Sequence, residues 1–192
     1  MVRLDKIVTK AGDGGRTRLA TGESVSKASA RVEAYGAVDE TNAAIGVARL
    51  HTKTDARLDP MLARVQNDLF DLGADLATPE TAAPPPFPAL RIQESQVDRL
   101  EAEVEALNAA LTPLASFILP AGNAAAAHLH LARTIARRAE RAIARLMEDA
   151  DERVSPAALK YMNRVSDLLF VAARAANADG AEDVLWTPGA HR

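Results

Sequence analysis

Apolar residues recur at intervals of three and four in five separate stretches of this chain, and this repeat constrains the fold most. An α-helix turns once every 3.6 residues, so such a spacing places the apolar side chains along one face. Five helices with one apolar face each can bury those faces against one another, which predicts an all-α five-helix bundle. The expected helices cover residues 30–50, 59–77, 92–111, 122–149 and 156–177.

Prolines mark the expected boundaries. Pro79 and the proline-rich run at 84–88 separate the second and third helices, while Pro113 and Pro120 precede the fourth. Pro156 falls in the first turn of the fifth helix, where its missing N–H costs least. The apolar faces of the fourth and fifth helices, which we call their seams, are rich in alanine, so these two backbones should approach closely. With no internal repeat, we expect one domain over 1–192, made of a glycine- and threonine-rich segment at 1–28, a bundle at 29–177 and a tail at 178–192.

Composition excludes several classes of function. A net charge of −3 and an aromatic content of 4% argue against a nucleic-acid partner. No apolar run approaches the ~20 residues that span a bilayer, and the first ten residues lack the apolar region of a secretory signal. The absence of cysteine excludes disulfides and thiolate metal sites. We therefore expect a cytoplasmic protein without a membrane partner.

The fourth expected helix carries a row of arginines spaced four residues apart, at Arg133, Arg137, Arg141 and Arg145. Side chains four apart are neighbours on a helix surface, so these like charges repel unless something anionic lies against them. The row borders the apolar seam, which favours an anion site. A solvated face with arginine–glutamate pairing explains the same pattern equally well.

A second candidate anion site lies at residues 9–17, which include three glycines, two threonines and a lysine, with Lys27 ten residues further on. Glycines let backbone N–H groups turn inward, and such concave loops bind anions. The lysine precedes the glycines and no strand–loop–helix unit surrounds them, so this is not a Walker A loop. A plain glycine-rich turn is the alternative.

Polar residues on the first and fifth helices complete the candidates. Asp39 lies beside the apolar Val38, and a buried carboxylate would need a cationic partner such as an arginine of the fourth helix. On the fifth helix, Asn163 offers both a donor and an acceptor, which suits a nucleobase or a ribose. It shares one stripe with Asp167, Phe170 and Arg174. An ordinary polar surface is the alternative at each position.

No metal site is expected. The four histidines lack metal-binding spacing, and neither His128 nor His130 has a glutamate three residues earlier, as a di-iron bundle requires.

Several segments together resemble the PduO-type ATP:cob(I)alamin adenosyltransferases, in the same order along nearly the whole chain. They are TKAGD at 9–13, RVEAYGAVDE at 31–40, FILP at 117–120, ARTIARRAER at 132–141 and YMNRVSDLLF at 161–170. Some positions depart from the family pattern: Ala11 stands where threonine is usual, Gly14-Gly15-Arg16 replaces Asp-Gly-Thr, and Pro120-Ala121-Gly122 replaces Pro-Gly-Gly.

The resemblance implies a homotrimeric five-helix bundle of ferritin-like appearance, with ATP bound at the subunit interfaces. It implies transfer of the 5′-deoxyadenosyl group of ATP to the cobalt of cob(I)alamin, giving adenosylcobalamin and tripolyphosphate. Phe117 would lie under the corrin ring and displace its lower axial ligand, while Asp39 and Arg133 would pair across the subunit boundary. The nucleotide would be held by Thr9, Lys10, Ala11, Gly12, Thr17, Arg18, Lys27, Arg137, Arg138, Ala139, Glu140, Arg141 and Asn163.

The resemblance further implies Mg²⁺ with the triphosphate, held largely by phosphate oxygens and water, and a reductase or an adenosylcobalamin-dependent enzyme as partner. Two other classes stay open. A non-catalytic nucleotide sensor would keep the loop and the arginines without an apolar wedge at Phe117. A helical scaffold or nucleic-acid adaptor would use the arginine row on phosphates, but the acidic net charge disfavours it.

Overall fold

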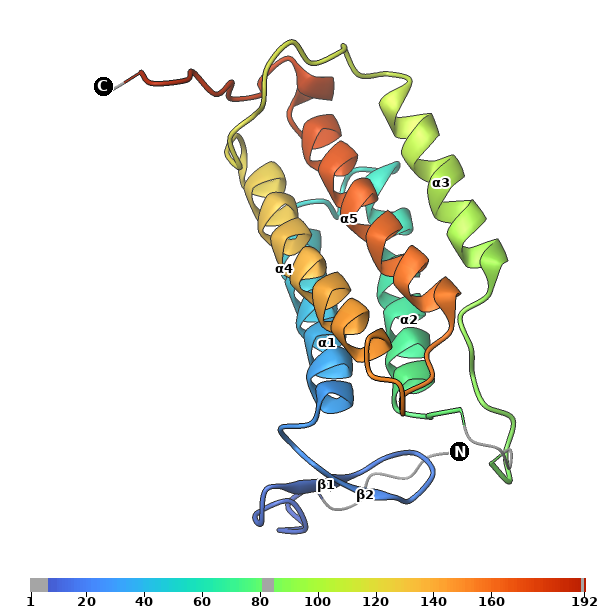
Figure 1. Cartoon of the computed structure of the whole chain (residues 1–192). Helices are drawn as coiled ribbons and strands as arrows, with labels where there is room; N and C mark the ends of the chain where they lie inside the picture. Colours follow the sequence, from blue (N-terminus) through green and yellow to red (C-terminus); the bar gives the residue numbers. More distant parts are fainter. Residues whose placement is uncertain (1–6, 81–84, 191) are drawn as a thin grey trace.

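The structure, a computed structural model, describes residues 7–80, 85–190 and 192. Its five long helices are α1 (Ala30–Arg49), α2 (Leu58–Leu76), α3 (Glu94–Asn108), α4 (Ala124–Met147) and α5 (Pro156–Ala176), arranged as a bundle (Figure 1). A short 3₁₀ turn, η1 (Ala178–Gly180), follows α5. The expected five-helix bundle is confirmed, and each helix ends within a few residues of the predicted position. No helix in the described part of the chain is both long and apolar enough to cross a membrane.

Helix α4 packs along both α1 and α5, while α2 lies against α1 and α3 against α5. The expected alanine seam allows this close approach, because Ala132, Ala136 and Ala139 are fully buried along α4. Asn123 begins the helix by accepting a hydrogen bond from the Ala126 N–H, and Pro156 stands in the first turn of α5 as predicted.

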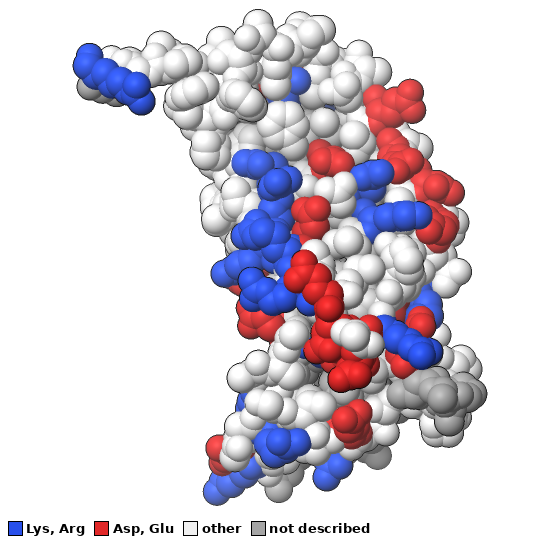
Figure 2. Space-filling view, viewed as in Figure 1, with Lys and Arg blue, Asp and Glu red and all other residues white. Residues whose placement is uncertain are grey.

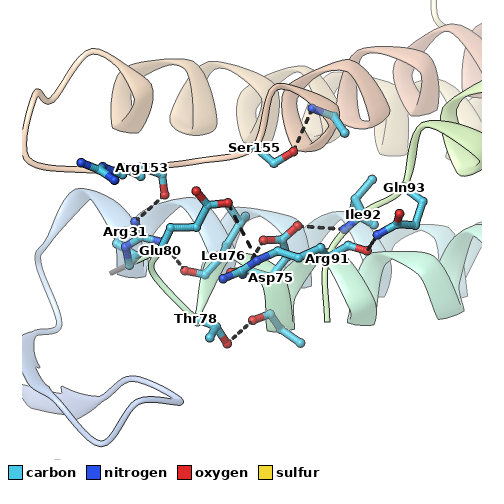
Figure 3. Close-up of polar contacts among 12 residues, drawn as sticks. Arg31, Asp75, Leu76, Thr78, Glu80, Arg91, Ile92, Gln93, Arg153 and Ser155 are labelled. Atoms are coloured by element: carbon cyan, nitrogen blue, oxygen red, sulfur yellow. Dashed lines mark hydrogen bonds and ion pairs between the residues drawn. The ribbon is translucent and has the colours of Figure 1, made fainter. Parts of the chain in front are cut away.

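A buried arginine ties together the end of the bundle at which α1 begins (Figure 3). Arg31 donates hydrogen bonds to the Leu76 carbonyl at 2.6 Å, to Glu152 Oε2 at 2.5 Å and to the Arg153 carbonyl at 3.3 Å. Nearby, the Asp75 carboxylate accepts from the Arg91 guanidinium and from the Ile92 N–H. These bonds join the start of α1 and the end of α2 to the segments that precede α5 and α3, so this end has a defined shape.

A two-stranded hairpin, which the sequence did not lead us to expect, lies beyond this end of the bundle (Figure 1). Strand β1 (Arg16–Arg18) pairs antiparallel with β2 (Ser24–Ser26), with Thr17 opposite Val25. The hairpin is anchored by a hydrogen bond from the Ala20 N–H to the Ala77 carbonyl and by the buried Leu19 side chain. The hairpin within the predicted nucleotide-binding segment is therefore fixed to the end of the bundle.

Candidate functional site

The arginine row lies on the surface of α4 beside its buried seam. Figure 2 shows Lys and Arg side chains gathered on the part of the molecular surface that α4 occupies in this view. Arg137 and Arg141 are exposed, and the Arg141 guanidinium donates to the Arg137 carbonyl. Arg138, which lies beside the row, forms an ion pair with Glu40 of α1, so the arginine–glutamate pairing of the alternative interpretation occurs next to the row.

Arg133 differs from the rest of the row because it is half-buried. Its Nε atom has no hydrogen-bond partner among the described residues, and its guanidinium lies over the Phe170 ring, 5.9 Å from the centroid. Burial, and then the nearby Arg137 charge, lower the pKa of Arg133 from its ordinary value. Two cations held together at a partly desolvated position favour a bound anion, which would relieve both effects.

A pocket of about 340 Å³ opens beside these two arginines, between α3, α4 and α5. Its wall includes Arg133, Arg137, Asp167 and Phe170. Burial raises the pKa of the Asp167 carboxyl, partly offset by the Arg164 charge. The predicted stripe on the fifth helix therefore does reach the arginine row, through Asp167 and Phe170.

Two further predicted nucleotide ligands meet next to this pocket. The Asn163 side-chain amide donates to Glu140 Oε1 at 2.9 Å, and its oxygen accepts from Arg164. Ala139 is different, because its side chain is fully buried in the α4 seam. The structure does not bring that side chain to the row of arginines.

The N-terminal candidates lie in the turn before β1 and in the hairpin. Lys10 has a left-handed backbone with φ of 60°. The Lys27 ammonium packs on Gly12, where an added Cβ would lie 2.7 Å from Nζ, so a larger residue there would displace the lysine end. Arg18 donates to the Gly22 carbonyl across the hairpin turn. Thr9, Lys10, Ala11, Arg18 and Lys27 are exposed, and Gly12 and Thr17 are partly buried.

These N-terminal donors do not converge with the arginine row inside one chain. Within the described ranges, no hydrogen bond or ion pair joins residues 7–28 to α4. Asp39 is exposed and forms no hydrogen bond or ion pair with α4 in the described part of the chain. The premise that it is a buried carboxylate is not met in the single chain, and its predicted pairing with Arg133 stays a prediction for a subunit boundary.

A second, apolar pocket of about 570 Å³ lies around Phe117. Phe117 is 77% exposed, although phenylalanine is usually buried. Its ring centroid is 6.1 Å from that of Trp186, which is 44% exposed. Both rings line this pocket together with Phe170, which also lines the pocket of Arg133 and Arg137. The two pockets therefore meet at one side chain.

The sequence reasoning assigned no role to Trp186. The tail that carries it pairs with the Phe117 segment: the Trp186 N–H donates to the Phe117 carbonyl at 2.8 Å, and Ser116 Oγ donates to the Trp186 carbonyl at 3.0 Å. The signal that could have identified it is its rarity, because it is the only tryptophan in the chain and stands outside every helical pattern.

Behind Phe170 lies the buried His130, whose ring meets the Phe170 ring edge-on at 6.2 Å. Neither ring nitrogen has a partner among the described residues. Burial, and then the Arg133 charge, lower the pKa of His130, which favours the neutral ring. No group of three or more histidine, aspartate or glutamate side chains in the described part of the chain could hold a metal ion.

The sequence profile of the cobalamin adenosyltransferase family matches residues 7–176. The chain belongs to this family. The adenosyltransferase chain is 48% identical over 191 residues to the corrinoid adenosyltransferase of Mycobacterium tuberculosis (strain ATCC 25618 / H37Rv), covering 100% of this chain and 97% of the relative. It is 40% identical over 183 residues to the corrinoid adenosyltransferase of Bacillus subtilis (strain 168), covering 93% and 91% of the two chains.

Solved structures agree with this family assignment. A variant PduO-type ATP:corrinoid adenosyltransferase from Lactobacillus reuteri, complexed with cobalamin and ATP, superposes with a TM-score of 0.83 at 38% identity. The match covers 95% of this adenosyltransferase chain and 97% of that one. Another variant of the same enzyme, complexed with ATP, gives a TM-score of 0.81 at 39% identity, over 94% and 100% of the chains.

Proposed function

We propose that the two adjoining pockets hold the two reactants of an ATP:corrinoid adenosyltransferase. The reaction transfers the 5′-deoxyadenosyl group of ATP to the cobalt of cob(I)alamin and releases tripolyphosphate. The observation that carries the proposal is that Phe170 lines both the apolar pocket and the pocket of Arg133 and Arg137. An apolar recess and a cationic recess are thus neighbours, as a direct transfer between two bound molecules requires.

The chemistry explains why cations serve the site and why no acid–base pair is needed. The cobalt(I) electron pair attacks C5′ of the ribose, the C5′–O bond breaks, and its electrons leave with the tripolyphosphate as cobalt becomes formally Co(III). The corrinoid supplies the nucleophile, so the protein contributes orientation and electrostatics. Arg137 and Arg141 would stabilise the charge that grows on the leaving group. Holding the reactants in line contributes roughly 7–11 kcal/mol in well-oriented systems.

Phe117 would act on the corrinoid. An exposed phenyl ring under the corrin excludes the lower axial base and water, so the cobalt becomes four-coordinate and easier to reduce to Co(I). The Trp186 ring beside it would extend the same apolar wall. A nucleotide sensor would have no use for this exposed pair of rings, which makes the sensor the weaker candidate.

The nucleotide pocket would be completed by a second copy of the chain. The N-terminal donors are exposed and do not reach α4 within one subunit, while Arg133 keeps an unpartnered Nε among the described residues. A homotrimer with ATP at each interface would bring Thr9, Lys10 and Lys27 of one subunit to the arginines of the next. The proposed Asp39–Arg133 pair would form across the same boundary.

Four further parts of the proposal concern the metal ion, the cellular location, the domain and the partner enzyme. Mg²⁺ would arrive with the triphosphate, because the described residues offer no cluster of ligands for it. A cytoplasmic location fits the cysteine-free chain, and residues 1–192 would act as one domain. A reductase would supply Co(I), or an adenosylcobalamin-dependent enzyme would accept the product.

The test is an absorbance assay with purified protein, ATP and chemically reduced cob(I)alamin, in which adenosylcobalamin formation is followed. We expect product only when protein, ATP and reductant are all present. ATP binding without any adenosylated product would refute the transferase and favour the sensor. If the protein instead binds nucleic acid, with an affinity that falls steeply as salt is added, the adaptor is favoured.

A further inference from the structure

A buried ion pair lies behind the Phe117 pocket without lining it. Arg174 Nε donates to Asp183 Oδ2 at 2.7 Å, and the two side chains are 4% and 3% exposed. Arg174 Nη2 also donates to the Thr112 carbonyl at 2.8 Å. One guanidinium on α5 therefore holds two separate segments, the one that leads into Phe117 and the one that leads into Trp186.

The buried Asn177 extends this connection. Its Oδ1 accepts from the Asn123 N–H at 3.0 Å, and its Nδ2 donates to the Ala121 carbonyl at 3.3 Å and to Asp183 Oδ1 at 3.5 Å. We call Arg174, Asn177 and Asp183 the latch. It joins the C-terminal end of α5 to both segments and to the start of α4.

Two glycines leave room for the latch. An added Cβ at Gly122 would lie 2.2 Å from Asn177 Nδ2, and one at Gly180 would lie 2.8 Å from Arg174 Nη2. Both glycines also have positive φ, 110° and 90° respectively, which disfavours any other residue there. The latch is therefore tightly packed on two sides.

Beyond the latch, the two segments run side by side to the aromatic pair. Directly after Asp183, the Val184 carbonyl accepts from the Leu119 N–H at 2.7 Å, and Ile118 and Leu185 form a β-bridge. The Trp186–Phe117 backbone bond follows. The position of Asp183 thus sets which residues of the tail lie opposite Phe117.

Stability alone does not explain a charged pair at this place. Burying two charges carries a desolvation cost that often equals the attraction between them, and apolar residues of similar volume can serve as well. What the pair adds is direction, because a guanidinium presents its donors in a fixed fork. We propose that Arg174 and Asp183 are positioning residues for the corrinoid: they hold Phe117 and Trp186 at the separation that the ring requires. This inference rests on the proposed function.

The test uses the full chain and the fluorescence of its single tryptophan, Trp186. In Asp183→Asn we expect acrylamide to quench Trp186 more strongly, and the KM for cob(I)alamin to rise about tenfold with an unchanged KM for ATP. The control is Asp179→Asn, which removes an exposed ion pair with Arg57 from the same turn but touches neither segment. It should leave quenching and both KM values as in the wild type.

Asp183→Asn leaves the buried guanidinium without its carboxylate, so it is tested alongside the double variant Arg174→Met with Asp183→Leu, which removes both charges. The double variant should keep wild-type helicity while still showing stronger quenching and the selective rise in the KM for cob(I)alamin. Unchanged quenching in the folded double variant would overturn the positioning role. Equal rises in both KM values would also overturn it, because they would indicate a general structural effect.

The quenching measurement needs no substrate, so it separates the two proposals. If the wild-type protein forms no adenosylcobalamin, the proposed function fails. If Trp186 becomes no more accessible when the latch is removed, the latch proposal fails, whatever the activity.

Discussion

Replacing Phe117 with alanine should separate the chemistry of the apolar pocket from the stability of the fold. Because Phe117 is 77% exposed, only about a quarter of its surface is buried. For a side chain that can bury roughly 200 Å², this is about 50 Å². At about 25 cal/mol per Å², the truncation should cost only about 1 kcal/mol of unfolding free energy. The melting temperature should then fall by roughly 2–4 °C.

The effect on activity should be much larger and should depend on the starting oxidation state. Beginning from cob(II)alamin with a reductant, we expect the rate for Phe117→Ala to fall at least about tenfold, which corresponds to about 1.4 kcal/mol in the barrier. Beginning from fully reduced cob(I)alamin, the rate should stay within about twofold, because the wedge assists the reduction step. ATP affinity should not change, since Phe117 does not line the pocket of Arg133 and Arg137.

The matched control is Phe70→Ala on α2. Phe70 is 72% exposed, so its truncation removes a similar ring at a similar cost, but it lines neither pocket. It should reproduce the small loss of stability without any loss of activity. If Phe117→Ala slowed turnover of cob(I)alamin as much as that of cob(II)alamin, a role in forming four-coordinate cobalt would be refuted.

Three other perturbations test the remaining parts of the site. Arg137→Ala should abolish ATP-dependent turnover, whereas Arg145→Ala, in the last turn of the same helix, should not; near-normal kinetics for Arg137→Ala would remove that residue from the site. Asp39→Asn should weaken the trimer in sedimentation or reduce kcat/KM, and no change in either measurement would count against the pairing with Arg133. The free energy of unfolding should decrease as the pH falls below about 6.5. This follows because burial lowers the pKa of His130, so the unfolded chain binds the extra proton first. The slope with pH should be shallower in His130→Leu, and an identical slope would show that another group titrates.

Local patterns in the sequence were enough to predict the five helices and their order. The 3.6-residue repeat, the prolines and the alanine-rich seams act over a few turns, so they can be read without knowing what packs where. The spacing of the arginines likewise predicted a row on one face of α4. Asn163 lies beside Glu140 of that helix, and the roles of both at the nucleotide stay predictions. The hairpin was missed because its strands are only three residues long and lack an alternating apolar pattern.

What the sequence alone determined is therefore the set of helices, their polar and apolar faces and, through ordered motifs, the family. Only the tertiary structure decided that Phe170 lines two pockets at once, that Trp186 lies beside Phe117, and that Arg174 binds both Thr112 and Asp183. These contacts join residues far apart in the chain, and such pairings follow from the packing of the whole bundle. The local repeat of apolar residues cannot predict these contacts. Phe117, Trp186, Thr112 and Asp183 lie in segments without a regular repeat, and a polar residue in such a segment could equally well face solvent.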